Sequence, residues 1–193
     1  MPDETYFARL VSLACHDLRT PLATVHGFAR TLARDDGLEP PADRYVEMID
    51  AASGQLDELI DELSLVARIE SGRYDPNLRE ANTLELAQAA AARLGEDRVR
   101  VTGSGAALET DVDTVERGLA ALFQSALRHG GLDEVAVDVG GTELRLSPVS
   151  AASAPVVLGD DLRDLGAAVA AALVRRLGGA LSLEGETLTI RLA

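Results

Sequence analysis

Apolar residues recur at alternating intervals of four and three along the first part of the chain, a heptad pattern typical of packed helices. The pattern begins near Glu4 and continues to about Arg34. Its apolar positions are Phe7, Val11, Ala14, Leu18, Pro21, Val25, Phe28 and Leu32. A glycine and paired prolines between residues 35 and 41 end this helix and start another. The sequence therefore predicts a hairpin of two long helices.

The second predicted helix runs from about Ala42 to Ser71 and carries two adjacent apolar stripes. The main stripe consists of Tyr45, Ile49, Ala52, Leu56, Leu59, Leu63 and Val66, and the flanking stripe consists of Val46, Ser53, Ile60 and Ala67. A lone hairpin would leave much of this apolar surface in water. We therefore expect two chains to associate as a four-helix bundle.

The pattern changes after Pro76. Helices are expected over residues 83–94, 111–129 and 160–177, and short strands over 99–102, 134–139, 143–146, 180–183 and 187–192. Gly140 and Gly141, between two of these strands, predict a β-hairpin. The predicted fold class is α+β. A long antiparallel helical hairpin (residues 1–76), forming a dimeric four-helix bundle, is followed by a small α/β sandwich (residues 77–193).

Composition and charge narrow the classes of function. A net charge of −14 disfavours nucleic acid and anionic membranes as partners. No run approaches the roughly 18 consecutive apolar residues of a membrane span, and the acidic N-terminus is unlike a signal peptide. Cys15 is the one cysteine, which excludes an internal disulfide and fits a reducing compartment. We expect a soluble, cytoplasmic protein without metal-ligand clusters.

His16 is the candidate reactive residue. With the apolar stripe of its helix buried, His16 falls on the outer face, and Thr20 lies one turn further on the same side. Pro21 removes the hydrogen bond to the carbonyl of Asp17, which costs about 3 kcal/mol in an ordinary helix and predicts a kink. Because local strain is often kept at functional sites, the kink beside an exposed His–Asp pair points to function.

The segment CHDLRTPL, residues 15–22, resembles the H-box of sensor histidine kinases, which reads His, an acidic residue, Leu, Arg, Thr or Asn, Pro, Leu. Two further segments, LDELIDEL at 56–63 and ARIESGR at 67–73, are similar to the end of the same family's hairpin. In that family the hairpin dimerises and phosphotransfer occurs on the histidine.

The resemblance implies a role for each of three residues. His16 matches the phosphoacceptor, which forms a phosphoramidate at Nε2. Asp17 matches the acidic neighbour that accepts a hydrogen bond from Nδ1–H and makes Nε2 more nucleophilic. Thr20 matches the position that orients a hydrolytic water for phosphatase action. A phosphoramidate is labile enough to pass its phosphoryl group to an aspartate.

Residues 77–193 resemble in outline the ATP-binding sandwich of the same family. The segment 111–130 is similar to the helix that carries the N-box, but Ala121 and Ser125 stand at its two Asn positions. The second Asn normally supplies a Mg²⁺ ligand, and serine is a weaker one. Ser150 stands where the family has its adenine-binding Asp, without the glycines that follow. Gly166 is the remnant of the final glycine motif, and the lid is shortened to about residues 154–163.

A phosphate-binding site needs closely approaching backbone N–H groups and a metal ligand. We therefore expect a degenerate domain that does not bind ATP. The interpretation is a homodimeric histidine phosphotransferase, which resembles phosphorelay proteins. It exchanges a phosphoryl group between His16 and the aspartate of a response-regulator receiver domain. This chain would bind no cofactor, because the receiver supplies Mg²⁺; a hybrid sensor kinase is a further expected partner.

Two alternatives stay open, namely an ATP-dependent sensor histidine kinase with a divergent pocket and a non-catalytic pseudokinase scaffold. The remaining chemistry-bearing residues are assigned structural roles. His26 is expected on the helix exterior, His129 as a favourable charge at a helix C-terminus, and Cys15 as a packed thiol near the dimer seam. A solvated acidic face that contributes to partner choice is predicted for Asp57, Glu58, Asp61 and Glu62.

Overall fold

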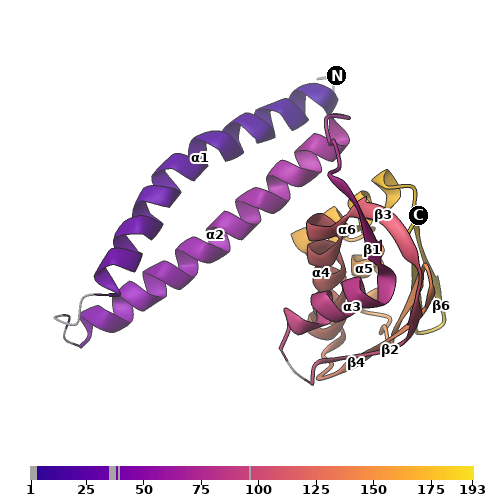
Figure 1. Cartoon of the computed structure of the whole chain (residues 1–193). Helices are drawn as coiled ribbons and strands as arrows, with labels where there is room; N and C mark the ends of the chain where they lie inside the picture. Colours follow the sequence, from indigo (N-terminus) through magenta and orange to yellow (C-terminus); the bar gives the residue numbers. More distant parts are fainter. Residues whose placement is uncertain (1–3, 35–37, 39, 96) are drawn as a thin grey trace. The chain divides into compact units, whose positions relative to one another are not determined.

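The computed structural model describes residues 4–34, 38, 40–95 and 97–193 (Figure 1). The chain divides into two compact units, Met1–Tyr74 and Asp75–Ala193. This division lies two residues before the boundary predicted from the sequence, after residue 76. The first unit contains the two long helices, and the second contains the strands and the shorter helices.

The first unit is an antiparallel hairpin of α1 (Glu4–Leu32) and α2 (Ala42–Glu70), which pack against each other. α1 continues as a helix through Pro21 and is bowed along its course (Figure 1). The second helix ends where Gly72 adopts a φ of 68° and the N–H of Arg73 donates to the carbonyl of Arg68. Glycine favours this left-handed conformation, which is a common helix terminator.

The hairpin packs through a stripe one position away from the one predicted for its first helix. Buried residues of this hairpin stripe are Ala8, Cys15 and Ala29 on α1, and Val46, Ser53, Ile60 and Ala67 on α2. The flanking stripe predicted on the second helix is therefore its intramolecular contact. Within one chain, the main stripes remain exposed: Leu18 is 53% exposed, Phe28 68% and Leu56 51%. The expectation that the main stripe of the first helix is buried is thus wrong for the single chain.

His26 corrects a related expectation. It follows Cys15 by eleven residues, about three helical turns, so it lies on the same side of α1 as the hairpin stripe and not on the helix exterior. Its Nε2 is 3.1 Å from Oδ1 of Asp50 on α2, and its side chain is only 21% exposed. Nε of Arg30 lies 3.6 Å from the same carboxylate oxygen. His26 therefore belongs to the contact between the two helices.

The second unit contains two sheets within its described residues. β1 (Leu78–Asn82) and β3 (Ala107–Asp111) form a two-stranded antiparallel sheet. The five-stranded sheet has the order β2-β4-β5-β7-β6. Its strands are β2 (Val99–Gly105), β4 (Val135–Gly141), β5 (Glu143–Ser147), β6 (Ala180–Glu184) and β7 (Thr187–Arg191). β2 and β4 run parallel, and the other neighbouring strands run antiparallel.

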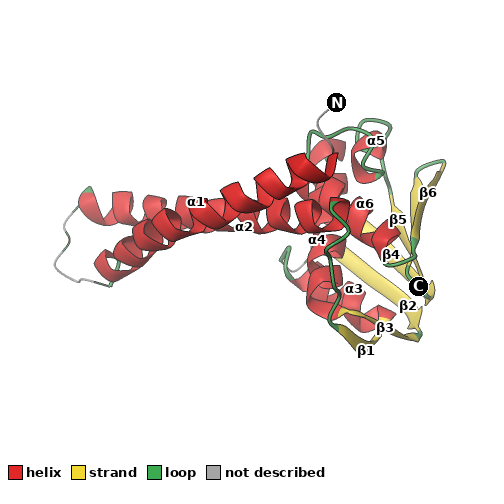
Figure 2. Cartoon of the chain, turned by 90° about the horizontal axis from the view of Figure 1, so that it is seen from above, coloured by secondary structure: helices red, strands yellow, loops and turns green. Residues whose placement is uncertain are grey.

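Helices cover one face of the five-stranded sheet (Figure 2). They are α3 (Thr83–Ala92), α4 (Val112–Gly130), the short α5 (Ala154–Val157) and α6 (Leu165–Arg176). The side chains of Val135, Val137 and Val139 are buried, and the residues between them in β4 are exposed. Phe123 of α4 is fully buried in the same layer. This alternation gives the sheet one face in the core and one face in solvent.

The α+β fold class is confirmed, and so is the hairpin at Gly140–Gly141, where Gly141 has a φ of 65°. Sequence reasoning missed β1, β3 and α5. It also began the helix after residue 160 too early. That helix starts at Leu165 because the side chain of Asp164 accepts a hydrogen bond from the N–H of Ala167 and caps it.

Gly103 generates a stability prediction. Its φ is 104°, and a Cβ there would overlap the backbone carbonyl of Val139 on the adjacent strand. We expect Gly103→Ala to lower the free energy of unfolding by about 1–3 kcal/mol, because the substitution combines backbone strain with a steric clash. Urea denaturation followed by circular dichroism measures this change.

Gly140 provides the matched control, since it lies opposite Ser104 on the neighbouring strand and a Cβ added to it would meet no heavy atom within 4 Å. Gly140→Ala should change the unfolding free energy by no more than about 0.5 kcal/mol. Equal effects of the two substitutions would contradict the assigned role of Gly103.

Candidate functional site

His16 projects from the first half of α1 into solvent, with 80% of its side chain exposed. Its Nδ1 lies 3.2 Å from Oδ1 of Asp17, whose side chain is also largely exposed. When Nδ1 carries the proton, it donates to this carboxylate, and the lone pair of Nε2 remains available. The structure therefore places a nucleophilic nitrogen on the surface beside a carboxylate that can orient it.

The helical turn that carries His16 is held from its inner side. Cys15 is only 2% exposed and lies within the hairpin stripe. Nη2 of Arg19 donates to Oδ1 of Asp61 at 2.6 Å and to Oγ of Ser64 at 3.3 Å, both on α2. These contacts fix the rotation of α1 about its axis, so that His16 and Asp17 face outward.

Arg19 makes a contact between the two helices that the sequence did not predict. It was part of the H-box pattern, but the partner on the second helix has no local sequence signal, because the two residues are 42 positions apart. The pairing corrects the expected role of Asp61, which is bonded across the hairpin and is not simply part of a solvated acidic face. Asp57 and Glu58 are exposed as expected.

Thr20 and Pro21 lie on the turn that follows. Thr20 is exposed, one turn beyond His16, and its carbonyl accepts a hydrogen bond from Oγ1 of Thr24 at 3.1 Å. Pro21 has no N–H, so the carbonyl of Asp17 receives no helical hydrogen bond from it. The predicted kink at Pro21 stays a prediction, because α1 is bowed over its whole course (Figure 1).

The predicted remnants of a nucleotide site lie around the second half of α4. Ser125 is fully buried, and its Oγ has no hydrogen-bond partner among the described residues. Oγ of Ser150 accepts from the N–H of Ser153 and lies 3.2 Å from its hydroxyl, which closes a local turn. Gly166 lies in the first turn of α6. The hydroxyls of Ser125 and Ser150 are thus a buried group and a turn-forming group.

The segment predicted to be a shortened lid contains α5, which packs against α4 and α6. Val156 and Val157 of this helix are fully buried. The segment is held by Nη2 of Arg175, which donates to the carbonyl of Leu158 at 2.7 Å. Apolar side chains of the lid itself therefore fill space next to the N-box-like helix.

His129 joins two helices of the same region. Its Nε2 lies 3.0 Å from Oδ2 of Asp164, while Oδ1 of this aspartate caps α6 by accepting from Ala167 at 3.1 Å. Both side chains are mostly buried. His129 therefore contacts the start of α6 from its position in the last turn of α4, which goes beyond the favourable helix-terminal charge expected from the sequence.

Residues 8–72 match the family model of the His Kinase A (phospho-acceptor) domain. The first unit is therefore similar to phospho-acceptor domains. Its matched range contains His16 and both helices of the hairpin. This match agrees with the H-box resemblance, whereas the individual roles of His16, Asp17 and Thr20 stay predictions.

Sequence relatives of this chain include sensor proteins. It is 32% identical over 149 residues to the sensor protein KdpD of Mycobacterium tuberculosis, which covers 71% of this chain and 17% of that protein. It is 29% identical over 195 residues to the sensor protein DivL of Caulobacter vibrioides, covering 89% of this chain and 25% of that protein. The chain therefore spans a quarter or less of the length of these curated relatives.

Solved structures show that the fold extends over both units. The crystal structure of full-length ShkA in complex with AMPPNP superposes with a TM-score of 0.68 at 20% identity, covering 94% of this chain and 44% of that one. The histidine kinase AdeS of Acinetobacter baumannii gives 0.58 at 21% identity, covering 92% of this chain and 97% of that one. The chain therefore shares the fold of these two proteins, a helical hairpin followed by an α/β sandwich.

Two features are absent from the described residues, 4–34, 38, 40–95 and 97–193. Within these ranges, no three His, Cys, Asp or Glu side chains are grouped so that they could hold a metal ion. None of the helices in the same ranges has the length and apolarity needed to cross a membrane.

Cys15 generates a prediction about the turn that carries His16. Because the thiol is buried between α1 and α2, we expect it to react with Ellman's reagent at least about ten-fold more slowly in the folded protein than in urea. Absorbance follows the reaction at the same pH in both states. Each unfolded chain should release one equivalent of coloured thiolate from the reagent, because the sequence has one cysteine. Equal rates in both states would mean that the hairpin stripe does not bury this residue.

Proposed function

We propose that this chain is a histidine phosphotransferase of two-component signalling. His16 would exchange a phosphoryl group with the aspartate of a receiver domain, either in a cytoplasmic response regulator or in a hybrid sensor kinase. The exposure of His16 beside Asp17, within a phospho-acceptor domain, is the observation that carries this proposal. An exposed imidazole can enter the concave site of a partner, which a buried one cannot.

The proposed reaction is an in-line displacement at phosphorus. Nε2 of His16 attacks the phosphoryl group of an aspartyl phosphate, an N–P bond forms, and the P–O bond to the aspartate breaks. The carboxylate of the receiver leaves with the electron pair. Asp17 accepts the hydrogen bond from Nδ1–H and stabilises the positive charge that develops on the imidazole. In the reverse reaction the carboxylate attacks and the imidazole leaves.

Thr20 is proposed to act on water. Its exposed hydroxyl lies one helical turn from His16, on the face that a docked receiver would approach. Held there, the hydroxyl can accept a hydrogen bond from a water molecule next to the aspartyl phosphate. Mg²⁺ bound by the receiver would offset the charge of the phosphoryl group.

We further propose that the second unit does not use ATP. Three observations support this part of the proposal. The N-box-like helix buries Ser125 instead of presenting an amide ligand, Ser150 is engaged with Ser153, and α5 packs its valines against α4 and α6. With these side chains buried or engaged, the positions of the family's nucleotide motifs have neither a metal ligand nor a partner for adenine.

Dimerisation follows from the surface of the hairpin. The exposed stripe includes Phe28 at 68% and Leu18 at 53% on α1, with Leu56 at 51% on α2. Leaving these side chains in water costs roughly 25 cal/mol for each Å² of apolar area. A second copy of the hairpin would cover the exposed stripe and complete a four-helix bundle around a two-fold axis.

Transfer from a labelled receiver tests the function. Receiver domains carrying ³²P on their aspartate are mixed with the full chain, and label on this chain is followed by gel autoradiography. We expect label that is lost in acid and kept in alkali, as an N–P bond requires. His16→Gln should abolish the label, and Asp17→Asn should slow transfer about ten-fold or more, since the imidazole loses its orienting carboxylate.

His26→Gln is the matched control, because it removes an imidazole of the same helix that lies against Asp50 and is not presented to partners. It should transfer at the rate of the unaltered chain. Label in the His16→Gln variant would refute the assignment of the phosphoacceptor. Labelled ATP with Mg²⁺ should give no incorporation, and label on His16 would support an autokinase instead. Absence of label with every receiver would support a scaffold.

The dimer generates a separate prediction. Phe28→Glu should raise the dissociation constant of the dimer at least about ten-fold, because each chain would place a charge in the apolar seam. Size exclusion with light scattering measures the oligomeric state. Leu162→Glu is the control, since Leu162 is 78% exposed in the second unit and lies outside the hairpin. A monomeric unaltered chain would contradict the proposed bundle.

A further inference from the structure

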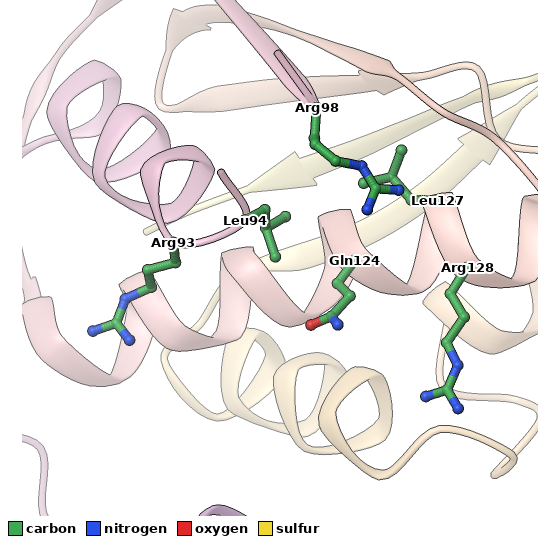
Figure 3. Close-up of a pocket in the computed structure, with 6 residues that line it drawn as sticks. All are labelled: Arg93, Leu94, Arg98, Gln124, Leu127 and Arg128. Carbon is green, nitrogen blue, oxygen red and sulfur yellow. The ribbon is translucent and has the colours of Figure 1, made fainter. Parts of the chain in front are cut away.

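A cavity of about 410 Å³ lies in the second unit between the end of α3, the start of β2 and one face of α4. It is lined by Arg93, Leu94, Arg98, Gln124, Leu127 and Arg128, and we refer to it as the arginine pocket (Figure 3). Gln124 and Arg128 are one helical turn apart on α4, and Arg98 reaches toward this helix from the strand above it (Figure 3). Three arginine residues therefore line one small cavity, and their guanidinium groups point in different directions (Figure 3).

The arginines of this pocket differ from several other arginines of the unit. Elsewhere in the described part of the unit, ion pairs with a carboxylate are formed by Arg79, Arg100, Arg145 and Arg163. Within the described residues, no carboxylate forms an ion pair with an arginine of the pocket. Nε of Arg98 donates to the backbone carbonyl of Asp133 at 3.3 Å, which leaves its Nη atoms for other acceptors.

The fold explains how these charges are tolerated together. Arg93 is the C-cap residue of α3, and Arg128 lies in the last turn of α4. The C-terminal end of a helix carries a partial negative charge that stabilises a nearby cation. The two helix ends therefore offset part of the mutual repulsion between the arginines. Unlike a carboxylate, they do not occupy the N–H donors of the guanidinium groups.

The lining indicates the chemistry of a ligand. Guanidinium groups present paired N–H donors that match the oxygens of phosphate and carboxylate groups, and Gln124 adds an amide donor. Leu127 is buried in the wall and Leu94 is partly buried, so the pocket also has an apolar side. Its volume lies within the range of sites for small molecules, which is about 300–1,000 Å³. We propose that the arginine pocket binds a small oxyanion with more than one negative charge.

This proposal is independent of the proposed phosphotransfer. Neither His16 nor any of the positions Ser125, Ser150 and Gly166 lines the pocket. Arg128 stands at the Arg/Lys position of the N-box-like segment, whereas Arg93 and Arg98 lie outside the nucleotide motifs. The pocket therefore combines residues that no nucleotide motif of the chain brings together.

Calorimetric titration of the full chain with inorganic pyrophosphate and with citrate at low ionic strength tests the proposal. We expect saturable binding to one site per chain that weakens as salt is added, since charge attraction is screened. Arg98→Gln and Arg128→Gln should each weaken binding about ten-fold, the effect of losing charge-assisted hydrogen bonds. Arg98→Lys should cause a smaller loss, because it keeps the charge and removes the paired donors.

Arg191→Gln is the matched control, since it removes the same charge from an exposed position of β7. It should leave the affinity within about two-fold of the unaltered chain, as expected for a distant charge under screening. Stronger binding of pyrophosphate assigns the pocket to phosphate groups, and stronger binding of citrate assigns it to carboxylates. Absence of saturable binding by both anions, or equal losses in Arg191→Gln and the pocket variants, would overturn the proposal.

Discussion

The contact between α1 and α2 through the hairpin stripe is the constraint on which the first unit depends. Cys15 and Ala29 on one helix and Ile60 on the other are buried in this stripe, which fixes the rotation of each helix about its axis. Once that rotation is fixed, the position of every other side chain follows from the helical repeat. His16 must then point to solvent, and the neighbouring apolar stripe must remain uncovered in a single chain.

Much of this arrangement was predictable from the sequence. Heptad spacing identified both helices of the hairpin, and alternation with turn residues identified the main strands of the sheet. The spacing could not show which of two adjacent stripes forms the hairpin, because both have the same period. That ambiguity placed His26 on the exterior, although it lies against Asp50.

The elements that the sequence did not predict have a different physical explanation. β1 and β3 form a separate small sheet, and their side chains alternate too weakly in burial to produce a clear pattern. The short α5 has too few residues to show helical periodicity, and it is held by long-range contacts such as that of Arg175. The pairing of Arg19 with Asp61 is likewise long-range. In each case tertiary contacts decide a structure that local sequence does not specify.

The packing of α5 also has a thermodynamic consequence. A domain that encloses a ligand gains stability in proportion to the logarithm of the ligand's concentration, so its folding equilibrium varies with the metabolic state of the cell. Val156 and Val157 are buried side chains of the chain itself, so every copy of the domain contains them. The stability that these side chains contribute therefore has no concentration term, and the domain receives it equally in a starved and in a growing cell.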